Sequence, residues 1–178
     1  MRTLYLLRHA KSSWDDSSLA DHDRPLAPRG RRAAPSMGRY MQSERLVPEL
    51  VLCSTAARTR ATWALAAPFL GDDIPVEYDR ELYGASAGTL LRVVRGLPDD
   101  VRRVLMVGHN PGWELFAAAL AGDGDRGAIA RMRRKFPTAA LAVLESPAER
   151  WTGVEAGGCR LERFVRPKDL PEAESRRL

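Results

Sequence analysis

The sequence predicts a single-domain α/β protein, a three-layer α/β/α arrangement in which helices cover both faces of a mostly parallel sheet. Short apolar runs alternate along the chain with segments of helical period, which is the pattern of parallel strands joined by helices. A length of 178 residues fits one domain, which we expect to span residues 1–166. The hydrophobic content of 44% is enough for one substantial core.

The first expected strand covers residues 3–8. The polar stretch 11–24 that follows is too rich in Asp and Ser to be core, so we expect a loop near the strand end. Pro28 suits the first turn of a helix that continues to about residue 43. Pro35 conflicts with a regular helix because an interior proline removes one backbone hydrogen bond, so we expect a kink or a late start there.

A second strand over 50–53 leads into a helix over 56–69. Ser54 or Thr55 can cap this helix because short hydroxyl side chains accept hydrogen bonds from the first backbone N–H groups. A third, short strand is expected over 75–78.

The second half repeats the alternation. A helix over 87–95 precedes a strand over 103–107, whose β-branched and apolar residues suit a central position. The next helix ends at Gly122, and its expected apolar face comprises Leu115, Phe116, Ala119 and Leu120. The remaining expectations are an irregular basic segment over 122–136, an edge hairpin pairing 139–145 with 151–155, and a loose charged tail over 167–178.

The formal net charge is +5 and the isoelectric point is near 9.7. The arginines are scattered, and the densest cluster comprises Arg131, Arg133, Arg134 and Lys135. This cluster lacks interleaved aromatic residues, so it indicates either a solvated helix face or a surface that steers an anionic substrate. We therefore expect no nucleic-acid partner.

Cys53 and Cys159 are the only two cysteines, too few for a four-cysteine zinc site or a disulfide framework. Cys53 lies in an apolar run and is expected to be a small buried hydrophobe. The amino terminus enters a strand at once and lacks the pattern of a signal peptide. No apolar stretch is long enough to span a bilayer. We expect a cytoplasmic protein with no membrane partner.

Four residues carry most of the expected chemistry. Arg8 and His9 follow the first strand, Arg58 lies in the first turn of the second helix, and His109 follows the strand over 103–107. Open α/β sheets build their sites at the carboxyl ends of strands. Two guanidinium groups and two imidazoles are therefore expected to converge there on one phosphoryl group.

The motifs around these residues resemble the histidine phosphatase superfamily, the phosphoglycerate mutase-like proteins. Leu6-Leu7-Arg8-His9-Ala10-Lys11-Ser12 is similar to its signature, with Ala10 in place of the usual glycine. Three further segments appear in family order: Asp23-Arg24-Pro25-Leu26, Ser54-Thr55-Ala56-Ala57-Arg58 and Gly108-His109-Asn110-Pro111. Together they resemble the branch of SixA-type phosphohistidine phosphatases. The resemblance implies a phosphoglycerate mutase-like fold without a large helical lid insertion.

In this interpretation His9, as a neutral imidazole, attacks phosphorus and forms a covalent phosphohistidine intermediate. Arg8, Arg58 and His109 bind the phosphoryl oxygens and stabilise the developing charge. Ser12 and Asn110 are further candidates for contacting phosphate. We expect no metal and no cofactor to be required.

Arg24 and Glu81 have two possible roles each. Arg24 lines the mouth of the pocket, or it holds the loop by pairing with Asp21 or Asp23. Glu81 is the best match to the acid that larger members carry between the two histidines, or it forms a salt bridge with Arg80 or Arg92. A missing acid favours P–N substrates, because imidazole is a much better leaving group than an alkoxide.

Three functions remain. The first is a phosphohistidine phosphatase that acts on a partner protein, a phosphorelay or phosphotransfer component in signal transduction. The second is a phosphomonoesterase for a small phosphorylated metabolite, which requires an acid and an enclosing lid. The loop over 12–21 and Glu81 discriminate between these two. The third is a non-catalytic protein that binds phosphate in a regulatory role.

Overall fold

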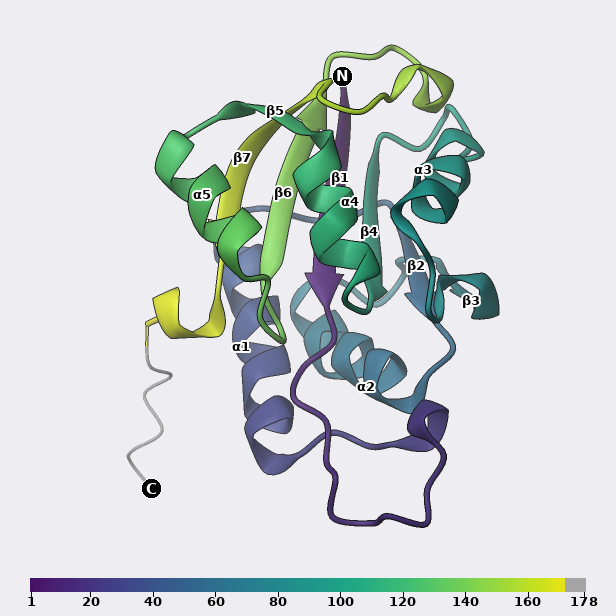
Figure 1. Cartoon of the computed structure of the whole chain (residues 1–178), viewed down its shortest axis with the longest axis vertical. Helices are drawn as coiled ribbons and strands as arrows, with labels where there is room; N and C mark the ends of the chain where they lie inside the picture. Colours follow the sequence, from purple (N-terminus) through teal and green to yellow (C-terminus); the bar gives the residue numbers. More distant parts are fainter. Residues whose placement is uncertain (172–178) are drawn as a thin grey trace.

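The computed structural model describes residues 1–171, and it confirms the predicted α/β class and the mostly parallel sheet (Figure 1). The seven strands lie in the order β3-β2-β4-β1-β6-β7-β5. Strand β6 is antiparallel to both β1 and β7, and the other neighbouring pairs are parallel. The strands are β1 (Arg2–Arg8), β2 (Leu50–Ser54), β3 (Val76–Asp79), β4 (Arg103–Gly108), β5 (Ala121–Gly124), β6 (Leu141–Ser146) and β7 (Cys159–Val165).

Five α-helices cover the two faces of this sheet. They are α1 (Pro28–Ser43), α2 (Ala57–Ala66), α3 (Ala87–Arg95), α4 (Gly112–Leu120) and α5 (Arg126–Arg134). Helices α1 and α2 pack on one face, and α3, α4 and α5 pack on the other. Short 3-10 turns are η1 (Asp21–Asp23), η2 (Ala67–Phe69), η3 (Arg80–Leu82), η4 (Trp151–Gly153) and η5 (Pro167–Asp169). No described helix has the length and apolarity that a bilayer crossing requires.

Strand β1 shows why the sheet is buried on both sides. Successive side chains of a strand point to opposite faces. Tyr5 and Leu7 pack with the core beneath α1 and α2, whereas Leu4 and Leu6 pack with the core beneath α3, α4 and α5. All four are buried. The continuous apolar run over 4–7 is thus explained by two cores, one on each face.

A late start of the first helix and a side-chain cap of the second were wrong. Helix α1 begins at Pro28 and continues through Pro35, and the alternative expectation of a kink there stays a prediction. Helix α2 begins after Ala56, and no side chain caps it. Ser54 is instead the last residue of β2 and contacts His109, while the Thr55 hydroxyl contacts His22. Both hydroxyls are therefore used to join separate segments of the chain.

The expected apolar face of α4 was also wrong in part. Leu115 is 56% exposed and Ala119 is exposed, while the buried residues are Trp113, Phe116, Ala117 and Leu120. The indole of Trp113 packs against Gly108, which rotates the helix relative to the expectation. The helix ends at Leu120, and Gly122 lies in β5.

The carboxyl-terminal third is more regular than predicted. The segment 122–136 contains most of β5 and all of α5. Strand β6 pairs with β7 over 159–165 and not with residues 151–155, and it lies inside the sheet beside β1. Of the predicted tail, Leu170 packs against the core beneath α1 and α2. Residues 172–178 lie outside the described residues, so the domain boundary at residue 166 stays a prediction.

Candidate active site

The two predicted catalytic histidines follow neighbouring parallel strands. Arg8 at the end of β1 lies opposite Gly108 at the end of β4, and His9 donates its backbone N–H to the Gly108 carbonyl at 2.9 Å. The rings of His9 and His109 are 5.3 Å apart between centroids. This spacing is close to that of adjacent strands. The sheet register therefore brings together residues that are a hundred positions apart in the sequence.

A close contact behind His109 fixes the end of β4. A Cβ atom placed on Gly108 would lie 2.0 Å from the indole ring of Trp113, which is fully buried. Only glycine leaves room for this ring. The turn from β4 into α4 thus rests on a packed indole, which holds the His109 backbone.

His9 is held as a neutral imidazole with one defined tautomer. Its Nδ1 atom lies 2.7 Å from the Ala10 carbonyl oxygen, which can only accept a hydrogen bond, so Nδ1 carries the hydrogen. The Nε2 atom then carries the lone pair. Burial lowers the pKa of His9 to about 4, with the positive charges of Arg58 and Arg8 acting in the same direction. His9 is therefore unprotonated, and available as a nucleophile, at neutral pH.

His109 has the opposite arrangement. Its Nε2 atom lies 2.7 Å from the hydroxyl oxygen of buried Ser54. The Ser54 hydroxyl oxygen also accepts a hydrogen bond from the Ala56 N–H. Within residues 1–171, His109 Nε2 is the one acceptor that the hydroxyl hydrogen of Ser54 can reach. Ser54 thus donates to Nε2, which places the ring hydrogen of His109 on Nδ1. Burial, with a contribution from His9, lowers the pKa of His109 to about 3, so this ring is also neutral.

Arg58 joins the site to the loop that follows β1. Its two terminal nitrogens donate to the Asp21 backbone carbonyl at 2.7 Å and to the Asp21 carboxylate at 3.0 Å. The same carboxylate accepts a hydrogen bond of 2.6 Å from the Tyr83 hydroxyl, which lowers the pKa of Asp21. The Tyr83 ring lies with its edge toward His109 at 5.3 Å between centroids. An anion that binds this end of Arg58 must therefore displace a carboxylate.

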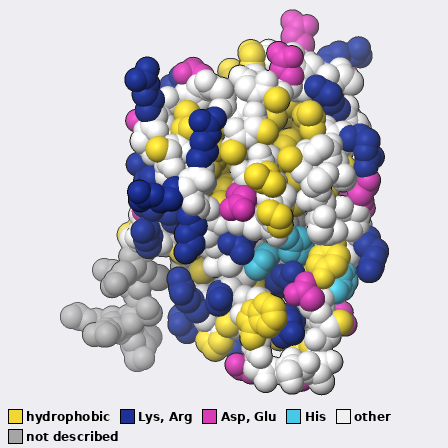
Figure 2. All heavy atoms as spheres, viewed as in Figure 1, with side chains coloured by type: hydrophobic (Ala, Val, Ile, Leu, Met, Phe, Trp, Pro, Cys, Tyr) yellow, Lys and Arg dark blue, Asp and Glu magenta, His cyan; other side chains and the backbone are white. Residues whose placement is uncertain are grey.

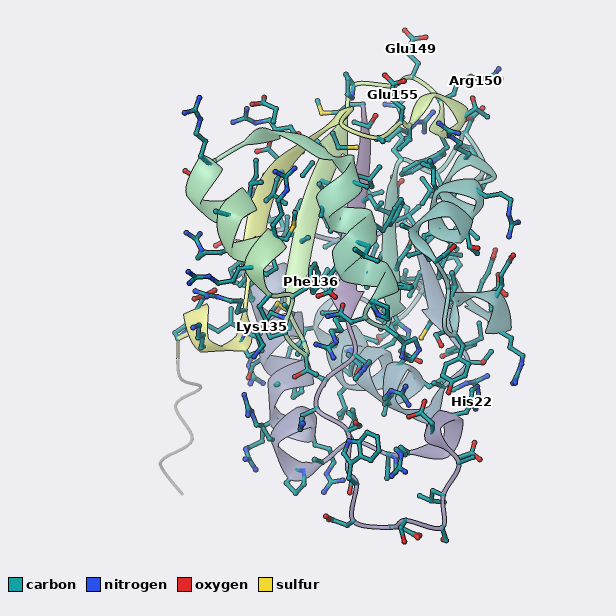
Figure 3. The ribbon with its side chains drawn as sticks, in the orientation of Figure 1. His22, Lys135, Phe136, Glu149, Arg150 and Glu155 are labelled. Carbon is teal, nitrogen blue, oxygen red and sulfur yellow. The ribbon has the colours of Figure 1, made fainter. Side chains whose placement is uncertain are left out.

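Arg8 and Asn110 share a carbonyl acceptor on the far side of the site. Arg8 donates to the Phe136 carbonyl at 2.9 Å, and the Asn110 amide donates to the same oxygen at 2.9 Å. Asn110 also donates to Glu114 at 3.2 Å. Phe136 comes directly after Lys135 on the segment that follows α5, and both are labelled in Figure 3. This segment borders the site opposite the loop that carries His22.

Arg24 pairs with Asp21, one of its two expected roles, while its place at the mouth of the pocket stays a prediction. Its Nε lies 3.9 Å from the Asp21 carboxylate, which satisfies an ion pair without a hydrogen bond. The guanidinium also stacks on the indole of Trp14 at 3.9 Å from the ring centroid. Trp14 is 63% exposed, and residues 14–18 of this loop are exposed. The loop end at Asp21 therefore packs over Arg58, while the loop tip extends into solvent.

The buried polar atoms that lack a hydrogen-bond partner are concentrated at this site. Within residues 1–171 they are Arg8 Nε, Arg24 Nε, Arg24 Nη1, His109 Nδ1 and Asn110 Oδ1. All belong to residues predicted to lie in the phosphate pocket or at its mouth, and all but the Asn110 oxygen are hydrogen-bond donors with the tautomer assigned above. A buried donor without a partner is costly. The site is therefore built to bind an acceptor-rich, negatively charged group.

Two other candidates lie apart from this cluster. Glu81 is exposed and forms an ion pair with Arg92. Its backbone N–H donates a hydrogen bond to the Asp79 side chain. Ser12 pairs with Leu26 in an isolated β-bridge. Among the described residues, neither side chain makes a hydrogen bond to the histidines.

Sequence reasoning missed Asp21 and Tyr83 as site residues, and it assigned Ser54 no role at His109. His22, which lies on the loop after β1, contacts the Thr55 hydroxyl at 2.8 Å and makes a T-shaped contact with the Tyr83 ring. The only signal for Tyr83 was its place before Gly84, whose φ of 70° allows the turn into α3. In the described part of the chain, no group of three or more His, Cys, Asp or Glu side chains is arranged to hold a metal ion.

Comparison with known proteins supports the resemblance drawn from the motifs. Residues 4–92 match the family model of the histidine phosphatase superfamily, branch 1. An uncharacterized Mycobacterium tuberculosis protein is 42% identical over 164 residues, which cover 91% of this chain and all of that protein. The chain therefore belongs to the histidine phosphatase superfamily.

Solved structures indicate the branch. A candidate phosphohistidine phosphatase SixA from Nakamurella multipartitia superposes with a TM-score of 0.81 at 34% identity, over 93% of this chain and 96% of that chain. A candidate SixA from Agrobacterium tumefaciens gives 0.78 at 33% identity, over 93% and 98%. The protein is a phosphatase of the SixA type within this superfamily.

Proposed function

We propose that the protein hydrolyses phosphohistidine on a partner protein, through a covalent intermediate on His9. The observation that carries the proposal is the set of buried, unpartnered donors on Arg8, Arg24 and His109, together with the free Nε2 of His9 on the ring beside His109. These donors fit the three oxygens of a phosphoryl group. The two solved relatives described above carry the name of phosphohistidine phosphatases, which supports the same substrate.

The chemistry follows from the tautomers. His9 Nε2 attacks phosphorus, and the P–N bond to the substrate imidazole breaks. The departing imidazole leaves as a neutral base once solvent has protonated its second nitrogen. The His9 ring then bears phosphorus on Nε2 and hydrogen on Nδ1, and its positive charge is stabilised by the Ala10 carbonyl. Water next attacks phosphorus, which releases phosphate and returns the lone pair to Nε2.

His109 Nδ1–H and the Arg8 and Arg24 guanidinium groups stabilise the transferring oxygens. Arg58 contributes positive charge close enough to lower the pKa of both histidines, and it holds the Asp21 loop. Asn110 orients the Phe136 carbonyl that binds Arg8. In this proposal no metal is required, and the protein acts in the cytoplasm on a phosphorelay or phosphotransfer component.

The position of Glu81 favours this substrate over a phosphate ester. Its carboxylate is exposed and paired with Arg92, and Asp21 is held as an ionised acceptor by Tyr83 and Arg58. Neither group is placed to protonate an alkoxide. A phosphohistidine substrate needs far less help from an acid.

The test compares two substrates: a histidine peptide phosphorylated chemically with phosphoramidate, and an alkyl phosphate ester, glycerol 2-phosphate, whose alkoxide leaving group needs a proton. Wild type and His9→Ala are measured with a metal chelator present. We expect chelator-resistant hydrolysis of the peptide that His9→Ala abolishes, with slow ester turnover. Fast ester turnover that Glu81→Gln slows would instead support a metabolite phosphatase. Inactivity on both substrates would support a phosphate-binding regulatory protein.

A further inference from the structure

The carboxyl-terminal half of α5 presents basic side chains to solvent. Ala128 and Met132 are the buried residues of this helix, and residues three apart share a helix face. Arg131 and Arg134 have this spacing, and both are exposed, as is Lys135. Their side chains make no hydrogen bond or ion pair with any other residue in the range 1–171. We call Arg131, Arg134 and Lys135 the α5 basic face.

The helix dipole accounts for part of this charge, because Arg131, Arg133 and Arg134 all lie in the last turn of α5. Cations in the last turn of a helix offset its dipole and bind the final carbonyls. Arg133 does so across elements, because it donates to the backbone carbonyls of Ala118 and Ala121. The side chains of the α5 basic face bind no carbonyl within residues 1–171, so their charge is directed to solvent.

This face is continuous with the active site. Lys135 precedes Phe136, whose carbonyl binds Arg8 and Asn110. Three residues later, Ala139 donates its backbone N–H to the His9 carbonyl at 3.0 Å. Figure 2 shows Lys and Arg side chains gathered over and below α5, on the same face of the molecule as the histidine side chains. A partner that inserts a side chain toward His9 therefore passes close to these charges.

We propose that the α5 basic face docks an acidic surface surrounding the phosphohistidine of the protein substrate. This inference rests on the proposed function, and it specifies the chemistry of the partner. A free phosphate or a small metabolite is too small to reach both α5 and His9 at once. Nucleic acid is disfavoured because the described part of α5 offers no aromatic side chain for base stacking. Acidic side chains beside the phosphohistidine supply the complementary charge.

The test uses two synthetic peptides phosphorylated on one central histidine. One carries Asp and Glu around that histidine, and the other carries Ser and Gln. The readout is the ratio of kcat/KM for the acidic peptide to that for the neutral peptide. Electrostatic steering raises association rates by roughly 10- to 1000-fold in favourable cases. We expect a wild-type ratio of about ten that decreases as salt increases.

The test variant is the double reversal Arg131→Glu, Arg134→Glu. The matched control is Arg45→Glu, Arg126→Glu, which changes the net charge equally. Arg45 and Arg126 are also exposed and make no side-chain ion pair within residues 1–171. Arg45 follows α1 before β2, and Arg126 begins α5 at the end opposite Phe136. We expect the ratio to fall to about one in the test variant and to keep its wild-type value in the control.

Several results would overturn the inference. A wild-type ratio of one, with both peptides hydrolysed, refutes the docking surface and leaves the proposed function intact. Equal losses in both double variants show that net charge alone matters. The face would instead belong to nucleic acid if wild type binds a fluorescent single-stranded oligonucleotide, the test variant does not, and the peptide ratio is the same in both. Failure of wild type to hydrolyse free phosphohistidine or either peptide refutes both proposals.

Discussion

Burial of two neutral histidines makes the folded state sensitive to acid, and His9→Gln should relieve part of that sensitivity. The pKa of His9 is lowered from about 6.5 to about 4, first of all by burial. Between these values the unfolded chain binds a proton that the folded chain does not. The free energy of unfolding therefore has its full value above about pH 6.5, and it decreases as the pH falls toward 4.

The magnitude follows from the two pKa values. Moving from about pH 7 to about pH 5 should lower the free energy of unfolding by roughly 2 kcal/mol through His9, because one pKa unit corresponds to about 1.4 kcal/mol. His109, with its pKa lowered to about 3, contributes a similar loss. In His9→Gln the contribution of His9 disappears. The free energy of unfolding should therefore decrease by about 2 kcal/mol less between about pH 7 and about pH 5 than it does in wild type.

The assay is urea denaturation followed by circular dichroism at a series of pH values. His22→Gln, which replaces the histidine on the loop that follows β1, is the control for changing any histidine. The reasoning is refuted if His9→Gln loses as much stability between pH 7 and pH 5 as wild type does. A titration of His9 in the folded protein centred near pH 6.5, followed by NMR chemical shifts, would refute the lowered pKa itself.

Three further substitutions test the geometry of the site. Arg58→Ala should lower kcat by on the order of 100-fold because it removes one source of positive charge. Arg58→Lys should not restore kcat because the planar fork that holds Asp21 is lost. Rates within threefold of wild type in either variant would contradict this. Ser54→Ala should lower kcat roughly 10- to 100-fold, by analogy with other groups that orient histidines. It should also change the ¹⁵N chemical shifts that report the His109 tautomer. Unaltered shifts would show that Ser54 does not set this tautomer. Gly108→Ala should lower the free energy of unfolding by about 1–3 kcal/mol because its Cβ overlaps the Trp113 indole, and urea denaturation that matches wild type would contradict the close contact.

The sequence was sufficient to predict the first four strands, which are parallel, and the meeting of the two histidines. Apolar runs before His9 and His109 indicate buried parallel strands, and parallel strands end at one edge. That argument needs no knowledge of loop conformations. The same logic places Ser54 at this edge, because β2 neighbours β4.

What could not be predicted depends on long-range contacts of irregular segments. Asp21 reaches Arg58 only because the loop after β1 folds back, and no periodicity encodes that path. The strand β7 was missed although Arg160 and Glu162 alternate with buried residues, which is a strand pattern, because the expected hairpin assigned its second strand to residues 151–155. The rotation of α4 depends on the Gly108 contact with Trp113, which spacing within the helix does not reveal.

The pairing of Arg8 with Gly108 has a practical consequence for altering this protein. The separation of the two imidazoles is a property of adjacent strands and does not depend on the exposed loop tip over 14–18. Exchange of residues 15–18, which keeps Trp14 stacked on Arg24, would change the surface beside the site while the two histidines keep their places. This part of the surface can therefore be redesigned without rebuilding the catalytic pair.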